Sequence, residues 1–410
     1  TRDAARHIAA GVRAHLGRLA HDRTLVLVLE DVHWADHATT DLIENLALQL
    51  TDERLLLVCA MRPDLGSRAW QLLETARART PTAAGAQVGV VQVQALQRGQ
   101  AEELLTELLD VGGLPSAVRS LVLEKSEGNP FYLEEVVHAL VDAGHIVREG
   151  GRWTTTGPIT ELALPGTLAG VLGARIDRLP DQERRVAQTA SVIGREFATP
   201  LLKAVMREPQ SAPPELERPL GKLTVEGLLS QVDMARFADY RFKHEFTRDA
   251  AYQRLLKKRR RELHARIGEE METLFGGHRE IAKDLAHHYR LGEQWLKTAL
   301  WSLEAARSAR RLYEPADAFE LAEAALEALS RVSDVAGDTE DATALHAEVL
   351  NELVSLGMQM RQHEQLELRP LLQERGELAV ELSRQVGIER ALVQSLVNLG
   401  NVHVLSGYPR

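Results

Sequence analysis

Two adjacent carboxylates follow an unbroken apolar run near the start of the chain. Residues 25–29 read Leu-Val-Leu-Val-Leu, and Glu30 and Asp31 come directly after them. Such a run is typical of a strand in a parallel sheet, and open α/β sheets bind ligands at the carboxyl edge of their strands. One carboxylate there can hold a phosphate-bound Mg²⁺, and a second can orient the water that attacks the phosphate. The alternative is a strand followed by a solvated acidic turn.

A second apolar run, residues 55–61, ends in Arg62. We expect both runs to be central parallel strands that are covered on both faces. A planar guanidinium at the end of such a strand is suited to contact a γ-phosphate. The alternative is a surface arginine that caps a strand end. Residues 88–93 are a weaker candidate for a third strand.

The segment Ser-Glu-Gly-Asn-Pro-Phe-Tyr-Leu-Glu-Glu, residues 126–135, predicts the start of a helix. Asn129 is a favourable N-cap, and the ring of Pro130 fixes the backbone angle that the first helical position requires. A well-capped helix explains this pattern by itself.

His244 stands at the start of a further predicted helix, within Phe-Lys-His-Glu-Phe-Thr-Arg-Asp-Ala-Ala-Tyr, residues 242–252. A lone histidine at such a place is either a ligand or a packing or capping residue. Five consecutive cations follow at residues 257–261. They could meet DNA phosphates, or form a solvated or carboxylate-paired helix face.

The composition indicates a mostly helical globular protein. Of the 410 residues, 44% are hydrophobic, 26% are charged and only 4% are aromatic, which disfavours a β-sandwich or barrel. The apolar runs are too short to span a bilayer, and the one cysteine, Cys59, excludes an internal disulfide. We therefore expect a cytoplasmic protein. The net charge of −10 argues against a surface that attracts nucleic acid over its whole extent.

Residues 30–36, Glu-Asp-Val-His-Trp-Ala-Asp, resemble the Walker B segment of STAND-class ATPases, which are signal-transduction relatives of AAA+ proteins. The strand that ends in Arg62 matches the family's sensor strand, and residues 128–131 match the Gly-Asn-Pro-Phe segment of its helical lid. Residues 242–252 match its winged helix. These segments are most similar to the ATPase region of bacterial class III adenylate/guanylate cyclases and related multidomain regulators.

The resemblance implies a multidomain, mostly α-helical chain with four parts. They are a truncated α/β core of the P-loop ATPase type over residues 1–110, a helical lid over 111–164, a winged-helix domain over 165–275 and tetratricopeptide-like helical repeats over 276–410. In the repeats, small residues recur seven apart at Ala299 and Ala306 and again at Ala318 and Ala325, a spacing that lets helices pack closely in pairs.

The resemblance also implies ATP or ADP and Mg²⁺ as ligands. Glu30 takes the role of the Mg²⁺-linked acid, Asp31 that of the catalytic acid, and Arg62 senses the γ-phosphate. Gly128 and Pro130 are expected against the nucleotide base. His244 is expected to contact the β-phosphate and to hold the closed, resting state.

The chain departs from the family in one important respect. The phosphate-cradling motif Gly-x-x-x-x-Gly-Lys-Ser/Thr occurs nowhere in the 410 residues. In the family this motif lies two strands before Walker B, so we expect it upstream of Thr1. The ATPase is then expected to be inactive in these residues alone.

Two classes of function follow. The first is a nucleotide-dependent signalling ATPase module that regulates an output domain outside this chain, an adenylate or guanylate cyclase, and that contacts protein partners through its helical repeats. The second is a binding protein: either the ATPase and repeat region of a DNA-binding transcriptional regulator, or a repeat scaffold with a degenerate ATPase.

Overall fold

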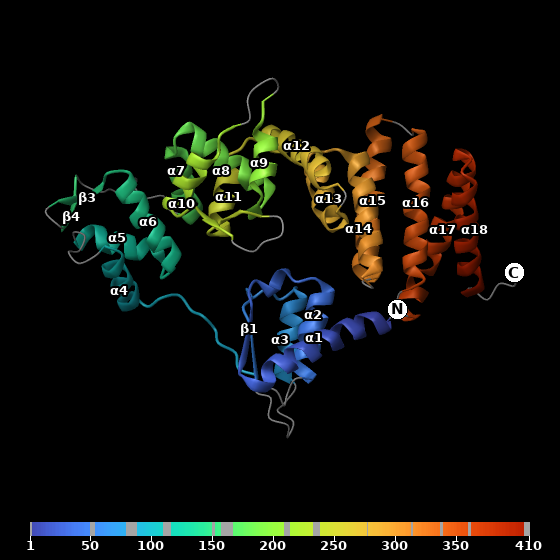
Figure 1. Ribbon diagram of the computed structural model, residues 1–410, viewed down its shortest axis with the longest axis horizontal. Coiled ribbons are helices and arrows are strands. Elements are labelled where there is room, and N and C mark those ends of the chain that lie inside the picture. Colours follow the sequence, from blue (N-terminus) through green and yellow to red (C-terminus); the bar gives the residue numbers. More distant parts are fainter. Residues whose placement is uncertain are drawn as a thin grey trace. The chain divides into compact units, whose positions relative to one another are not determined.

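The fold is mostly helical, as the composition predicted, with a few small sheets (Figure 1). The computed structural model describes residues 2–49, 54–78, 88–109, 116–149, 152–156, 167–208, 214–232, 238–276, 278–312, 315–336, 339–359 and 362–405. Contacts divide the chain into two compact units, residues 1–91 with 277–290 and 294–410, and residues 92–276 with 291–293. Within the described ranges, no helix is both long and apolar enough to cross a membrane.

The α/β part of the first unit contains two parallel strands that pair in register, with Leu25 opposite Leu55 and Leu29 opposite Cys59. Its elements are α1 (Arg2–Asp22), β1 (Leu25–Leu29), the short 3-10 helix η1 (Val32–Trp34), α2 (His37–Gln49), β2 (Leu55–Cys59) and α3 (Arg68–Ala78). The two strands expected from the apolar runs are therefore confirmed.

The expectation that both sheet faces are covered is wrong for the described residues. Leu29, Leu57 and Cys59 pack with Ile43 of α2 and Ala69 of α3. The side chains on the opposite face are exposed, namely Val26, Val28, Leu56 and Val58. Successive side chains of a strand point to opposite faces, so one helical layer covers only alternate residues. Burial raises the pKa of the Cys59 thiol, which packs as a small apolar side chain.

Residues 88–97 form neither a helix nor a strand, so the third strand suggested for residues 88–93 is absent from the structure. The apolar side chains of this segment are exposed, Val91 and Val93 by about nine-tenths. A strand needs a neighbouring backbone with which to form hydrogen bonds. In the described part of the α/β sheet, β1 and β2 pair only with each other, and residues 88–93 pair with neither.

The second unit begins with a helical bundle and a hairpin. The elements are α4 (Arg98–Leu108), α5 (Ser116–Ser126), α6 (Pro130–Asp142), β3 (Ile146–Glu149) and β4 (Arg152–Thr155). The strands β3 and β4 pair antiparallel, and Gly150 and Gly151 between them lie outside the described residues. Leu133 and Val136 of α6 are fully buried in the core of this α4–α6 bundle.

A second core follows in the same unit. Its elements are α7 (Leu168–Arg178), α8 (Asp181–Ile193), β5 (Glu196–Phe197), α9 (Thr199–Met206), α10 (Glu217–Val225), β6 (Leu229–Gln231), β7 (Tyr240–Phe242), α11 (Glu245–Gln253) and α12 (Lys257–Phe275). The strands β6 and β7 pair antiparallel, and β5 adds a third strand beside β7. We call this part the α8–α11 bundle, because Val186 of α8 and Ala251 of α11 are buried in one core.

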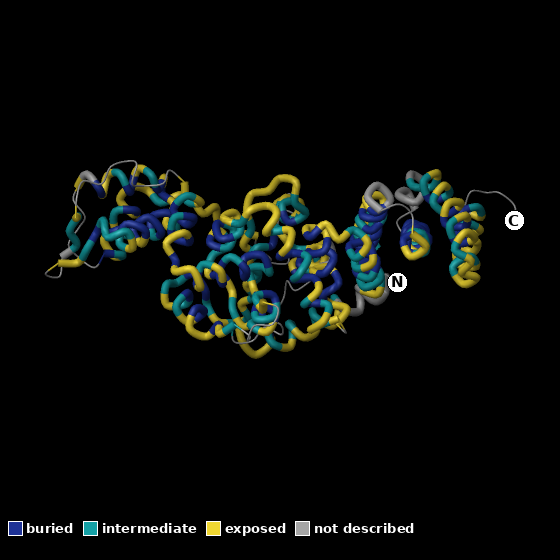
Figure 2. Tube along the Cα trace, turned by 90° about the horizontal axis from the view of Figure 1, so that it is seen from above, coloured by how far each residue is buried: buried dark blue, intermediate teal, exposed yellow. Residues whose placement is uncertain are grey.

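The remaining helices form an array of paired helices. They are α13 (Ala282–Leu291) after the 3-10 turn η3 (Arg279–Ile281), α14 (Trp295–Arg311), α15 (Pro315–Ala336), α16 (Glu340–Gly357), α17 (Gln362–Val386) and α18 (Glu389–Leu405). Ala299, Ala306, Ala318 and Ala325 are completely buried in one core, which confirms the close packing expected from their spacing. Buried and exposed residues alternate along these helices, as amphipathic packing requires (Figure 2).

Candidate functional site

The parallel pairing places the sequence-predicted residues Glu30, Asp31 and Arg62 at one edge of the α/β sheet. The ladder continues past the strand ends, because the Ala60 amide donates to the Leu29 carbonyl at 2.8 Å and the Val32 amide donates to the Ala60 carbonyl at 3.0 Å. The acidic pair follows β1 and Arg62 follows β2, and the backbones of these two segments are hydrogen-bonded to each other as far as Val32 and Ala60.

Asp31 has a left-handed backbone, with φ 55° and ψ 33°. For a residue with a Cβ atom this conformation costs about 1–2 kcal/mol, and Asp is one of the few residue types that tolerate it. It makes no side-chain cap on η1, although it occupies the capping position. Asp also adopts this conformation in ordinary turns, so the catalytic role of Asp31 stays a prediction.

His33 connects the two strand ends, and the sequence analysis did not select it. The Arg62 amide donates to His33 Nδ1 at 3.5 Å, a long hydrogen bond. Because Nδ1 accepts, a neutral imidazole carries its proton on Nε2, and Nε2 is buried without a partner. The only sequence signal for this contact is the position of His33, two residues after an acidic pair at the end of an apolar run.

A metal ion at this edge would be coordinated by few protein ligands. No group of three or more His, Cys, Asp or Glu side chains able to hold a metal occurs within the described ranges. Mg²⁺ commonly uses one or two carboxylates together with substrate phosphates and water, so a site built on the exposed Glu30 fits the chemistry of Mg²⁺ with a bound nucleotide. The assignment of Glu30 as its ligand stays a prediction.

The second set of predicted residues lies in the 92–276 unit. Asn129 caps α6, with its side-chain oxygen accepting from the amides of Phe131 at 3.0 Å and Tyr132 at 3.3 Å, and Pro130 occupies the first helical position. The local prediction for this helix start is therefore confirmed.

The packing around residue 128 explains why this residue is a glycine. Its φ is +73°, and its carbonyl accepts from the Leu96 amide at 2.8 Å. A Cβ atom added at Gly128 would lie 2.3 Å from the Leu96 carbonyl oxygen, so only glycine allows this approach. Close packing on Leu96 explains Gly128 without a ligand, and its contact with a nucleotide base stays a prediction.

The structure brings His244 to the lid-like helix start. His244 is the N-cap of α11 but makes no side-chain cap, and its ring centroid lies 4.1 Å from that of Phe131. Burial lowers the pKa of His244, and the adjacent Lys243 lowers it further. The imidazole therefore favours its neutral form, in which it can donate one hydrogen bond to an anion and accept another.

The basic run after α11 is mostly engaged within the protein. Arg259 pairs with Glu262 at 3.3 Å and Arg261 with Glu293 at 2.8 Å. Arg260 lies over the Tyr252 ring and donates to two carbonyls at the end of α11. These contacts support the carboxylate-paired alternative over a DNA-binding face.

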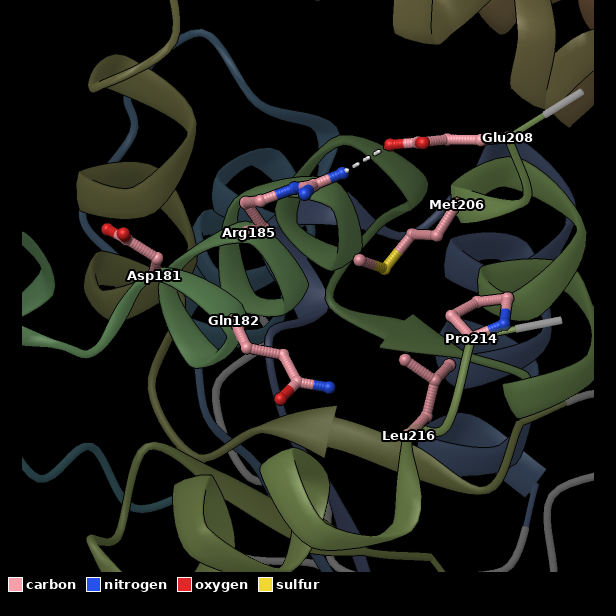
Figure 3. Close-up of a pocket in the computed structure, with 7 residues that line it drawn as sticks. All are labelled: Asp181, Gln182, Arg185, Met206, Glu208, Pro214 and Leu216. Carbon is pink, nitrogen blue, oxygen red and sulfur yellow. Dashed lines mark hydrogen bonds and ion pairs between the residues drawn. The ribbon is translucent and has the colours of Figure 1, made fainter. Parts of the chain in front are cut away.

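A shallow pocket in the α8–α11 bundle contains none of the predicted site residues (Figure 3). It is lined by Asp181, Gln182, Arg185, Met206, Glu208, Pro214 and Leu216. Arg185 and Glu208 pair across it at 3.2 Å, both largely exposed. Because its charged lining side chains, Asp181, Arg185 and Glu208, are all largely exposed to solvent, we assign no function to this pocket.

Sequence comparison finds a distant relative of part of this chain. No family model matches the chain. An uncharacterized protein of Rhizobium meliloti (strain 1021) is 24% identical over 251 residues, which cover 59% of this chain and 22% of that protein. The chain thus spans less than a quarter of the length of this relative.

Among solved structures, the chain is similar to a Signal Transduction ATPase with Numerous Domains (STAND) protein with a tetratricopeptide repeat sensor from Pyrococcus horikoshii. The sequences are 12% identical, the match covers 99% of this chain and 62% of the other, and the TM-score is 0.39.

Proposed function

We propose that this chain is part of a nucleotide-dependent signalling ATPase of the STAND class. The observation that supports it most directly is the sheet edge at which Glu30 and Asp31 follow β1 and Arg62 follows β2. Backbone hydrogen bonds join these two parallel segments as far as Ala60. Two carboxylates and a guanidinium on neighbouring strand ends are the groups that Mg²⁺-dependent phosphate hydrolysis requires.

In this proposal Glu30 holds Mg²⁺ and Asp31 orients the attacking water. The left-handed backbone of Asp31 keeps its carboxylate from serving as an ordinary helix cap. Arg62 detects the γ-phosphate, and the hydrogen bond of its amide to His33 fixes its backbone relative to the acidic pair.

His244 would report the nucleotide state as a neutral donor to a phosphate, since burial disfavours its charged form. In the same proposal residues 111–164, which contain α5 and α6, are the lid, and residues 165–275, which contain α7–α12 and the β5–β7 sheet, are a winged-helix domain. Residues 276–410, which contain α13–α18, are tetratricopeptide-like repeats that contact protein partners. An adenylate or guanylate cyclase as the output domain rests on the sequence resemblance alone and stays a prediction.

Isothermal titration with Mg-ATP tests the proposal. Residues 1–410 contain no Gly-x-x-x-x-Gly-Lys-Ser/Thr motif to cradle phosphates, so we expect them to bind Mg-ATP weakly and to hydrolyse essentially none. The whole protein should bind it tightly and hydrolyse it. Submicromolar binding by residues 1–410 alone would show that the site is misassigned, and absence of binding by the whole protein would refute the function.

A further inference from the structure

Helix α18 exposes an apolar stripe. Val393, Val397, Gly400 and Val404 recur at intervals of four, three and four residues, so they lie on one face of the helix. The side chains of the three valines are 61%, 52% and 52% exposed. We call these four residues the α18 stripe. Contiguous exposed apolar surface of this kind marks a place where another segment or molecule packs.

The opposite face of α18 is packed against α16 and α17. The buried Ser395 accepts from Asn351 Nδ2 of α16 at 2.8 Å and lies 3.0 Å from Ser383 Oγ of α17. Asn398 donates to the Asn351 carbonyl at 3.1 Å, and Val402 is buried as well. These contacts fix the orientation of α18, so that the stripe faces away from α16 and α17.

The residue types of the stripe do not suit a solvated helix. Valine is a poorer helix former than alanine, and glycine is poorer still, because it loses the most backbone freedom on folding. A Cβ atom added at Gly400 would meet nothing within 4 Å, so no contact within the described chain requires a glycine there. Close approach by a segment outside the described residues explains both the valines and the glycine.

Helix α14 has the same pattern of positions, and there the stripe is covered. Ala299, Leu303 and Ala306 of α14 are completely buried in one core with residues of α15. They stand 16, 12 and 9 positions before Pro315, the first residue of α15. The two helices lie side by side (Figure 1).

The sequence repeats this spacing at α18. Val393, Val397 and Gly400 stand 16, 12 and 9 positions before Pro409. Proline is favoured at the first position of a helix and disfavoured within one. Pro409 itself lies outside the described residues. By this spacing α18 is the counterpart of α14, with an uncovered stripe where α15 packs on α14.

We propose that the residues that follow α18 in the whole protein form an amphipathic helix that packs on the α18 stripe as α15 packs on α14. Gly400 takes the place of Ala306 and lets the two helix backbones approach closely. Short connections join antiparallel helices, so the covering helix runs antiparallel to α18. This packing does not depend on nucleotide binding and therefore stands apart from the proposed function.

Thiol labelling in the whole protein tests whether the stripe is covered. Val397→Cys, in a Cys59→Ser background, is treated with N-ethylmaleimide, and the modified peptide is followed by mass spectrometry. We expect labelling slower by about tenfold or more than at Ser330→Cys, an exposed position of α15, and equal rates in urea. Equal rates in the folded protein would overturn the proposal. Protection that fades on dilution would also overturn it, since a second copy would then be the cover.

Photo-crosslinking identifies the segment that covers the stripe. Asn401, which is exposed beside the stripe, is replaced by p-benzoylphenylalanine, and the whole protein is irradiated. We expect crosslinks within one chain to the residues three to ten positions after Pro409, the counterparts of Ala318–Ala325 in α15. Crosslinks to a second copy, or to any other part of the protein, would contradict the proposal.

A variant at Gly400 tests the close approach of the two helices. Gly400→Leu should push the covering helix away and so speed the labelling of Val397→Cys toward that of Ser330→Cys. Gly221→Leu is the matched control, because Gly221 also lies in a helix, α10, and its added Cβ also meets nothing within 4 Å. With the control, labelling should stay slow. Labelling that stays slow with Gly400→Leu would refute the close approach at Gly400.

Discussion

The rings of Phe131 and His244 pack against each other, with centroids 4.1 Å apart and planes inclined by 43°. Phe131 comes from the first turn of α6 and His244 from the residue that precedes α11. The contact joins the start of α6 to the start of α11, and it couples the environment of a titratable group to the position of a helix.

Phe131→Ala should raise the pKa of His244 toward its ordinary value of about 6.5. Loss of the ring exposes the imidazole, and burial is the main cause that lowers this pKa. An NMR titration, with the His244 signal assigned by its absence in His244→Gln, measures the change. Phe246→Ala is the control, because Phe246 is 45% exposed and should matter less. An unchanged pKa in Phe131→Ala would contradict the coupling.

The same lowered pKa predicts how stability depends on pH. Below about pH 6.5 the unfolded chain takes up a proton at His244 before the folded one does, so the unfolding free energy falls as pH falls through this window. Above it, the contribution is fully present. The melting temperature of the unsubstituted protein minus that of His244→Gln should fall as the pH is lowered through this range. A signed difference that rises toward acid pH would contradict the assignment.

Asp31→Asn in the whole protein should leave nucleotide binding largely intact and slow hydrolysis by on the order of a hundredfold or more, since a water-orienting carboxylate loses its charge. Glu30→Gln should instead weaken the dependence on Mg²⁺. Titration calorimetry and single-turnover hydrolysis at several Mg²⁺ concentrations separate the two effects. Equal, small effects of both changes would mean that the acidic pair is a solvated strand end.

His33→Phe should slow hydrolysis by about twofold to tenfold, the worth of one hydrogen bond of 0.5–1.5 kcal/mol. The phenyl ring keeps the bulk of the imidazole but cannot accept from the Arg62 amide. His33→Asn is the matched variant, because its side-chain oxygen can accept in place of Nδ1, and it should recover most of the rate. If hydrolysis by His33→Asn is as slow as hydrolysis by His33→Phe, the hydrogen bond from the Arg62 amide to His33 has no role in the reaction.

Gly128→Ala should lower the melting temperature more than Gly144→Ala. Both glycines have a positive φ, +73° and +68°, so each substitution carries the left-handed penalty of about 1–2 kcal/mol. Only Gly128 adds a collision, since its Cβ would meet the Leu96 carbonyl, whereas a Cβ at Gly144 meets nothing within 4 Å. Equal losses in the two variants would show that the approach to Leu96 is dispensable.

Local rules made several features predictable from the sequence. Two examples are the cap of α6 by Asn129 and the strands β1 and β2. Each depends on residues that are close in sequence, and residue propensity and spacing predict local structure of this kind. The burial of Ala299 and Ala306 follows from the same periodicity. The placement of Glu30 and Asp31 at a strand end also belongs here, because it requires only that the apolar run be a strand.

Only the tertiary structure decided which distant side chains meet. Arg175 and Glu135 are 40 residues apart, and Arg62 and His33 are 29 apart. No spacing rule links such pairs, because their contact depends on how helices and strands pack in three dimensions. The same holds for the sheet: an apolar run fixes the strand, but the layers packed on it decide whether Val26 and Val28 are covered, and in this structure they are exposed.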